Sequence, residues 1–112
     1  MGSERPPAKL VNNELLVCDG SIINSNLVYR SVISPGVIIE NGAEVTDSII
    51  FDNAWIGQNT RVHRAIIDKY VKIAPGTVVD GRRLDSFGLV EGEDYKITDS
   101  GITVIGKGVE LK

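Results

Sequence analysis

The nucleophilic and metal-binding side chains of this 112-residue chain are few and isolated. There is one cysteine, Cys18, and one histidine, His63, and they lie far apart in the sequence. No Gly-x-Ser-x-Gly sequence is present, and no group of ligands has the short spacing of a metal site. The Pro-Gly pairs at 35–36 and 75–76 suit tight turns better than a phosphate loop. We therefore predict no catalytic residue, no metal site and no cofactor.

Cationic side chains are the more promising feature, because they gather in one part of an acidic chain. The whole sequence has 15 Asp and Glu against 12 Lys and Arg, for a formal net charge of −3. Two or three neighbouring cations can bind a phosphorylated metabolite through charge-assisted hydrogen bonds. Arg64 has a second interpretation, a surface ion ladder with Arg30 and Asp47. The cluster consists of Arg61, His63, Arg64, Lys69, Lys72, Arg82 and Arg83, opposed by Asp68 and Asp80.

Composition argues against several classes of partner. The acidic balance makes nucleic acid an unsuitable main partner. No apolar run approaches the roughly 20 residues of a membrane-spanning helix. A single cysteine cannot form an intrachain disulfide, which favours a reducing compartment, and we expect a cytoplasmic protein. The length allows one small domain.

An internal repeat predicts the elements that position these residues. Aliphatic residues recur at intervals of six, six and five, so that a block of 17 residues occurs four times. No helix has this period. It fits short strands separated by corners of about 120°, three to a triangular coil, with coils stacked about 4.8 Å apart. The predicted inward residues are Leu16, Ile22, Val28, Ile33, Ile39, Val45, Ile50, Ile56, Val62, Ile67, Ile73 and Val79.

Residue types at the corners support this coil. Tight turns need residues that tolerate positive φ, and Tyr70 is the one exception at two aligned corners. Small residues are expected to point into the corners. The turn positions are Asp19, Gly36, Asn53 and Tyr70, then Ser25, Gly42, Asn59 and Gly76; the small residues are Asn26, Ala43, Thr60, Thr77, Ser31, Ser48 and Ala65.

The three outer walls differ in polarity. One wall is apolar, with Leu15 and Val17 among its residues, and a second adds Ile38, whereas the third is polar. An apolar outer surface predicts docking against another protein surface or the C-terminal segment. The predicted interface residues are Val32, Ile49, Phe51, Trp55 and Ile66, and the polar wall carries Glu44, Thr46, Arg61 and His63.

The chain divides into three predicted segments. Residues 1–13 are expected to be a tag or linker and an extended lead-in, because paired prolines disfavour helix. Residues 14–80 form the β-helix, and residues 81–112 form a loop and a C-terminal hairpin. Two alternating runs, 95–98 and 102–105, flank a turn at 99–101, and this hairpin would cap the last coil.

The segments together resemble the C-terminal β-helix domain of the glucose-1-phosphate adenylyltransferases, also called ADP-glucose pyrophosphorylases. The similarity covers the lead-in at 6–11, the coil segments at 47–51, 55–57 and 64–69, and the final strand at 101–108. It implies an all-β fold, a left-handed parallel β-helix of the hexapeptide-repeat type, with about four triangular coils and a C-terminal β-hairpin cap. The left hand comes from the family alone.

This resemblance also implies a function. The family makes ADP-glucose and pyrophosphate from ATP and glucose 1-phosphate, with its catalytic residues in an N-terminal nucleotidyltransferase domain that nothing here matches. The β-helix domain serves homo-oligomer assembly and allosteric control by phosphorylated sugars. Two effector-binding cations of the family correspond to Lys69 and Lys107, and Arg64 is the third candidate. Bacterial members often have Arg at these positions, and lysine loses the bidentate geometry.

Two alternatives remain at this point. A hexapeptide-repeat acyltransferase uses a similar prism with a catalytic histidine, which would have to be His63. A purely structural oligomerisation module would use the apolar wall and leave the cations incidental.

Overall fold

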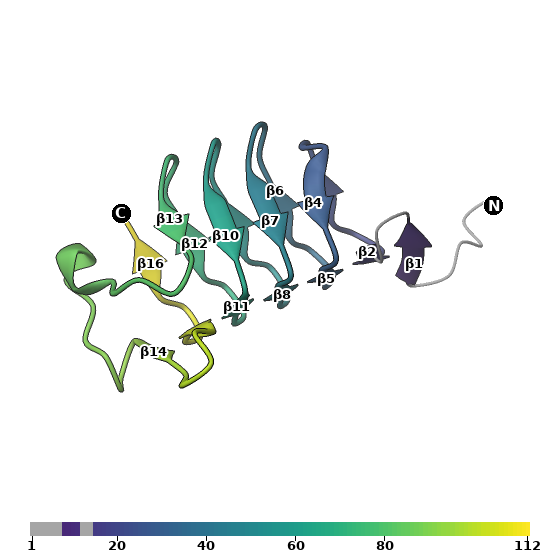
Figure 1. Cartoon of the computed structure of the whole chain (residues 1–112). Helices are drawn as coiled ribbons and strands as arrows, with labels where there is room; N and C mark the ends of the chain where they lie inside the picture. Colours follow the sequence, from purple (N-terminus) through teal and green to yellow (C-terminus); the bar gives the residue numbers. More distant parts are fainter. Residues whose placement is uncertain (1–7, 12–14) are drawn as a thin grey trace.

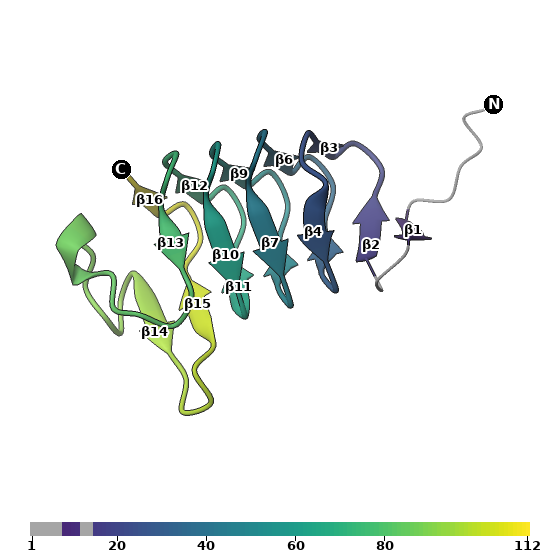
Figure 2. The same cartoon turned by 45° about the horizontal axis from the view of Figure 1, so that its top comes forward.

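The computed structural model describes residues 8–11 and 15–112, which form a three-sided solenoid of stacked coils (Figure 1). Most of the predicted lead-in, residues 1–7 and 12–13, lies outside the described residues. The solenoid is elongated, with extents of 46 × 24 × 23 Å. β1 (Ala8–Val11) and β16 (Glu110–Leu111), the first and last described strands, lie at opposite ends of the stack in both views (Figures 1 and 2). None of the described residues forms a helix with the length and apolarity to cross a bilayer.

Each side of the solenoid is one sheet, and the strands of successive coils pair in parallel. The first sheet contains, in spatial order, β1 (Ala8–Val11), β2 (Leu15–Cys18), β5 (Val32–Ile33), β8 (Ile49–Ile50), β11 (Ala65–Ile67), β15 (Thr103–Ile105) and β14 (Tyr95–Ile97). The second contains β3 (Ile22–Ile23), β6 (Ile38–Ile39), β9 (Trp55–Ile56), β12 (Lys72–Ile73) and β16 (Glu110–Leu111). The third contains β4 (Leu27–Tyr29), β7 (Glu44–Thr46), β10 (Arg61–His63) and β13 (Val78–Val79).

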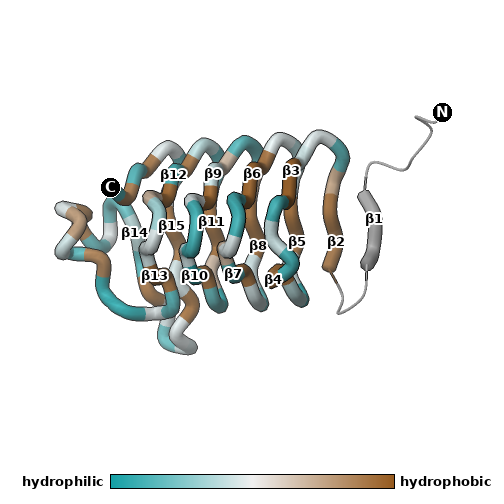
Figure 3. The backbone as a smooth tube through the Cα atoms, turned by 90° about the horizontal axis from the view of Figure 1, so that it is seen from above, coloured by the Kyte–Doolittle hydropathy of each residue, from teal (hydrophilic) through white to brown (hydrophobic). Residues whose placement is uncertain are grey.

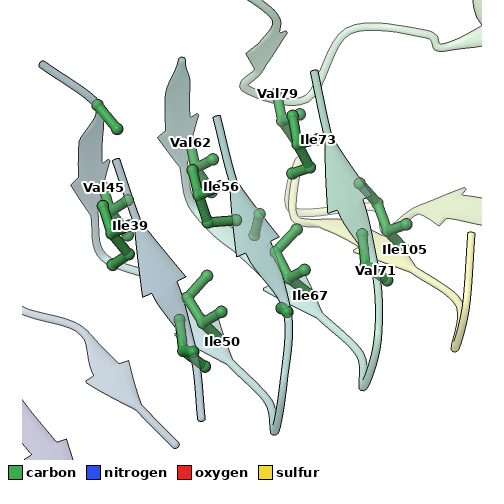
Figure 4. Close-up of a cluster of buried hydrophobic side chains, with 14 of the residues drawn as sticks. Ile39, Val45, Ile50, Ile56, Val62, Ile67, Val71, Ile73, Val79 and Ile105 are labelled. Carbon is green, nitrogen blue, oxygen red and sulfur yellow. The ribbon is translucent and has the colours of Figure 1, made fainter. Parts of the chain in front are cut away.

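Three columns of aliphatic side chains fill the interior, one from each sheet (Figure 4). Most of these residues have no exposed surface, so the core is a continuous apolar column along the solenoid axis. The columns are Ile33, Ile50, Ile67 and Ile105; Ile39, Ile56, Ile73 and Leu111; and Val28, Val45, Val62 and Val79. This architecture confirms the predicted all-β, left-handed β-helix class with about four coils.

The predicted register of the first coil is wrong by one residue. Val17 pairs with Ile33, and Ile23 with Ile39, so Leu16 and Ile22 face outward. Ile22 is 52% exposed. Leu15 is buried rather than on the outer wall.

A shorter corner causes this shift. Three residues join β3 to β4, whereas four join β6 to β7. The Ser25 hydroxyl bridges the shortened turn, because it donates to the Ala43 carbonyl at 2.5 Å and accepts the Leu27 N–H at 3.0 Å. A strict 17-residue spacing therefore fails upstream of this corner. For the same reason Gly20, and not Asp19, has the positive φ, and Asn26 is exposed rather than buried.

The C-terminal hairpin is present and does more than cap the end. β14 and β15 pair antiparallel, which confirms the predicted hairpin. β15 also pairs in parallel with β11, and β16 pairs with β12. These two strands add a fifth layer to the first and second sheets, while the third sheet ends at β13.

Candidate functional site

The two predicted effector lysines lie at the same corner of adjacent coils. Lys69 is in the turn between β11 and β12, and Lys107 is in the turn between β15 and β16. The Gly108 N–H donates to the Lys69 carbonyl at 2.8 Å, so one turn stacks directly on the other. Both residues are exposed. The structure thus brings together two cations whose backbones are about one strand spacing, 4.8 Å, apart.

The Lys69 ammonium is held near the outer face of the first sheet. Its Nζ lies 5.3 Å from the centre of the Phe51 ring and 4.0 Å from Asp68 Oδ1. The same Asp68 oxygen accepts the Lys69 backbone N–H at 2.7 Å, which fixes the start of the turn. Lys107 takes part in no ion pair within residues 8–11 and 15–112. The pair therefore retains positive charge for an external anion.

Arg64 does not join this pair. It occupies the corner at the other end of β11, and about 13 Å of extended chain separates positions 64 and 68. Below it in the stack, Arg30 donates two hydrogen bonds to Asp47, at 2.7 and 3.1 Å. Those bonds hold the pKa of Asp47 below its ordinary value, and the charge of Arg64 contributes less to the same shift. Arg30 and Asp47 form the lower part of the predicted ion ladder, and Arg64 acts on Asp47 only through its charge.

Arg61, Arg82 and Arg83 of the predicted cluster are each paired with an acidic side chain. Arg82 binds Asp80 through two hydrogen bonds of 2.8 and 3.1 Å. Arg83 donates to Asp85 at 2.7 Å and to Glu91 at 2.8 Å. Sequence reasoning missed the last two pairs, because the acids come from a loop whose path no periodicity predicts.

His63 lies on the polar outer face of the third sheet, as predicted. Its Nδ1 is 2.7 Å from Thr46 Oγ1 and 3.8 Å from Asp47 Oδ2. Over the described ranges, no three His, Cys, Asp or Glu side chains come close enough to hold a metal ion.

The outer face of the first sheet carries a continuous apolar row, whose members belong to the strands of that sheet that Figure 3 colours brown. Neighbouring members of the row are register partners in adjacent strands, and Ile49 at its centre is 37% exposed. The sequence-based interface did not include Val104, the last member of the row, although Val104 lies in the alternating run at 102–105. The row, named here the apolar row, consists of Leu16, Val32, Ile49, Ile66 and Val104.

The other two predicted interface residues have different surroundings. Phe51 borders the apolar row and lies under the Lys69 ammonium. Trp55 belongs to the second sheet, and its indole N–H donates to the Glu40 carboxylate at 2.8 Å. The predicted interface residues therefore occupy two faces of the solenoid.

Comparison with known proteins agrees with this architecture. A family model described as GlmU-like, C-terminal hexapeptide matches residues 6–105. The chain is 42% identical over 93 positions to the glucose-1-phosphate adenylyltransferase of Rhodopirellula baltica, covering 83% of this chain and 20% of that protein. The enzymes of the same name from Leifsonia xyli subsp. xyli and Geobacter metallireducens are 37% and 36% identical, covering 95% and 89% of this chain.

The chain spans only a fifth to about a quarter of the length of these relatives, 20%, 27% and 26% respectively. It matches their C-terminal hexapeptide region, which confirms the resemblance inferred from the coil segments and the final strand. The chain therefore belongs to the family of GlmU-like C-terminal hexapeptide domains.

Proposed function

We propose that this chain is the regulatory and assembly domain of a cytoplasmic glucose-1-phosphate adenylyltransferase. The complete enzyme would make ADP-glucose and pyrophosphate from ATP and glucose 1-phosphate, with catalysis in an N-terminal nucleotidyltransferase domain. The similarity to three glucose-1-phosphate adenylyltransferases supports the reaction.

The proposed regulatory role rests on the stacked turns that contain Lys69 and Lys107. Two ammonium groups from adjacent layers can share the oxygens of one phosphate through charge-assisted hydrogen bonds. Among the described residues only Asp68 is paired with them, so the corner keeps a net positive charge. We assign the phosphate of a phosphorylated sugar effector to this corner. Because further cations would come from the N-terminal domain, we expect a dissociation constant on the order of a millimolar for the chain alone.

The apolar row supports the assembly part. A row of aliphatic side chains along one outer face, with Ile49 more than a third exposed, is an unusual surface for a free monomer. We assign this face to contacts with the N-terminal domain and with other subunits of a homo-oligomer.

Calorimetric titration of the chain with fructose 1,6-bisphosphate, fructose 6-phosphate and acetyl-CoA tests the regulatory part. We expect the phosphosugars to bind, and Lys69→Gln and Lys107→Gln each to weaken binding at least fivefold. Lys72→Gln is the matched control, since Lys72 is exposed on the next strand and faces Glu110 across β12 and β16.

Other outcomes would favour the alternatives. Binding of acetyl-CoA that depends on His63 would support an acyltransferase instead. Equal weakening by Lys72→Gln would show that only the overall charge matters. No binding of any of the three ligands at 10 mM, roughly ten times the expected dissociation constant, would leave a purely structural module.

A further inference from the structure

A cavity of about 410 Å³ lies at the C-terminal end of the third sheet. One side is the corner at 74–78, which leads into β13, and the opposite side is the loop at 82–87. Lys112 stands at its edge. This volume is within the range of small-molecule sites, roughly 300–1,000 Å³. Neither Lys69 nor Lys107 lines it, so the cavity is separate from the corner described above.

The cavity exists because the fifth layer is incomplete. β15 and β16 extend the first two sheets, but no strand of the described residues follows β13 in the third. In this sheet the N–H groups point toward the C-terminal end, as when Glu44 donates to the Thr60 carbonyl and Arg61 to the Thr77 carbonyl. By the same pattern the Val78 N–H points beyond the last strand, where the cavity lies. An edge strand thus provides a backbone donor to a bound molecule.

The charged side chains that line the cavity all carry the same sign. They are Arg82, Arg83 and Lys112, and no acidic side chain of the described residues lines it. The acids that pair with these cations, Asp80, Asp85, Glu91 and Glu110, lie outside the lining.

The ion pairs with these acids orient the two guanidinium groups. Arg82 uses Nε and Nη2 on Asp80, and Arg83 uses Nε and Nη1 on Asp85 and Glu91. One terminal nitrogen of each group remains for another acceptor. A guanidinium held by a carboxylate on one side loses less conformational freedom when it binds an anion on the other.

The rest of the lining is mainly apolar. Pro75, Leu84 and Phe87 provide hydrocarbon and ring surface, and Ser86 provides a hydroxyl group. Leu84 is almost fully buried, so this part of the wall is anchored in the core. A bare phosphate ion would leave most of the cavity empty, whereas a ligand with a ring could cover these side chains.

We propose that this cavity binds a phosphate monoester with a ring-sized body. The phosphate oxygens accept hydrogen bonds from Arg82, Arg83 and Lys112, and the ring packs against Pro75 and Phe87. Phosphate suits this lining because it offers several acceptor oxygens to the guanidinium nitrogens that the partner acids do not use. The site is independent of the function proposed above, since it uses none of the residues assigned there.

Titration of the isotope-labelled chain with phenyl phosphate, followed by NMR, tests the proposal. We expect saturable shifts of the Val78, Ser86 and Phe87 amides, and tighter binding of phenyl phosphate than of inorganic phosphate. Arg82→Gln and Lys112→Gln should each weaken binding about tenfold or more, as expected for a lost charge-assisted hydrogen bond. Neither cation contributes to the core, so the amide spectrum should otherwise be retained.

Two control variants make the result specific. Arg61→Gln removes the same charge one coil below, from an exposed residue near Glu44, and should leave the affinity unchanged. Lys69→Gln should also leave it unchanged. The proposal is overturned if the shifts map to the turns at 69–70 and 107–108, if Arg61→Gln weakens binding as much as Arg82→Gln, if inorganic phosphate binds equally well, or if no saturable shift occurs.

Discussion

At the residue scale, the glycines at the corners differ in the space that surrounds them, and so in what an added Cβ atom would contact. Gly36 and Gly76 both have φ near +75°, at 74° and 79°. A Cβ at Gly36 would collide with the side chain of Asn53 in the next coil, whereas one at Gly76 would meet open space. The stacked Gly36 and Asn53 therefore depend on each other, and Gly76 is needed only for its backbone conformation.

We expect Gly76→Ala to lower the free energy of unfolding by about 1 kcal/mol, the strain of a left-handed conformation. Gly36→Ala should lower it by about 2 kcal/mol or more, because the Asn53 side chain must also move. Urea unfolding of both variants measures the difference. Equal destabilisation would mean that Asn53 adjusts without cost.

Thr103 carries a buried hydroxyl group that has no hydrogen-bond partner in the part of the chain that the structure describes. In the stack below, the Ser31 hydroxyl accepts the Ser48 N–H and the Ser48 hydroxyl accepts the Ala65 N–H, both at 3.1 Å. Ala65 has no hydroxyl to continue this series. Thr103 lies directly above it with no exposed surface, and its Oγ1 makes no hydrogen bond within the described residues.

Thr103→Val should therefore raise the free energy of unfolding by about 1 kcal/mol, because valine keeps the shape and removes an unpaired polar atom. Thermal unfolding at neutral pH checks this. A lower melting temperature in the variant would show that the hydroxyl group has a partner in solution.

At the element scale, the register of β3 decides which of two adjacent isoleucines belongs to the core. The observed pairing of Ile23 with Ile39 predicts that Ile23→Ser costs at least about 1.5 kcal/mol through lost apolar burial. Ile22→Ser should stay within about 0.5 kcal/mol of the wild type, since Ile22 is 52% exposed. Chemical unfolding of the two variants tests this order, and the reverse order would restore the strict 17-residue register.

The C-terminal loop is attached to the hairpin by a hydrogen-bonded carboxylate. The Tyr95 hydroxyl donates to Asp85 Oδ1 at 2.6 Å, and Arg83 donates to the other oxygen. The Tyr95 bond is the main cause of a lowered Asp85 pKa, and the Arg83 bond is the next. Because the charged form is favoured in the folded state, this stabilisation is present above pH 3.8, the ordinary value, and is lost as the pH falls through the lowered pKa.

Tyr95→Phe removes the larger of the two bonds. We expect the pKa of Asp85 to rise toward 3.8, so that the loop loosens at a higher pH than in the wild type. The carboxyl carbon shift of Asp85, followed by NMR from pH 2 to 6, measures this in both proteins. An unchanged titration would assign the lowered pKa to Arg83 alone.

At the scale of the whole molecule, the apolar row predicts self-association of the isolated chain. Ile49 lies at the centre of the row and makes no contribution to the interior, so Ile49→Lys should retain the fold and shift the chain toward the monomer. Ile22→Lys changes an exposed isoleucine on the second sheet and is the matched control. Light scattering at several concentrations measures the mass, and a monomeric wild-type chain would contradict the prediction.

Three of the five layers could be read from the sequence, because residues 33–79 repeat without interruption and each interior position accepts only an aliphatic side chain. The first coil could not be placed in the same way. The corner between β3 and β4 is one residue shorter than the next one, so the inward positions of β2 and β3 are shifted by one residue. Local composition does not show where a corner has been shortened. Both candidate registers put an isoleucine inward, so the pattern alone could not choose between them.

Periodicity and residue types were enough to predict the solenoid, its apolar outer face and the cations near its C-terminal end. Which of those cations lie close together depends on the three-dimensional path of the chain. Lys69 and Lys107 lie at the same corner because a loop and a hairpin return the chain to the next layer. Arg82 and Arg83 instead pair with Asp80 and Asp85, and both arginines line the cavity. Periodicity specifies residues that stack at a fixed interval, but a charge pair depends on distances in space that a non-repeating loop sets.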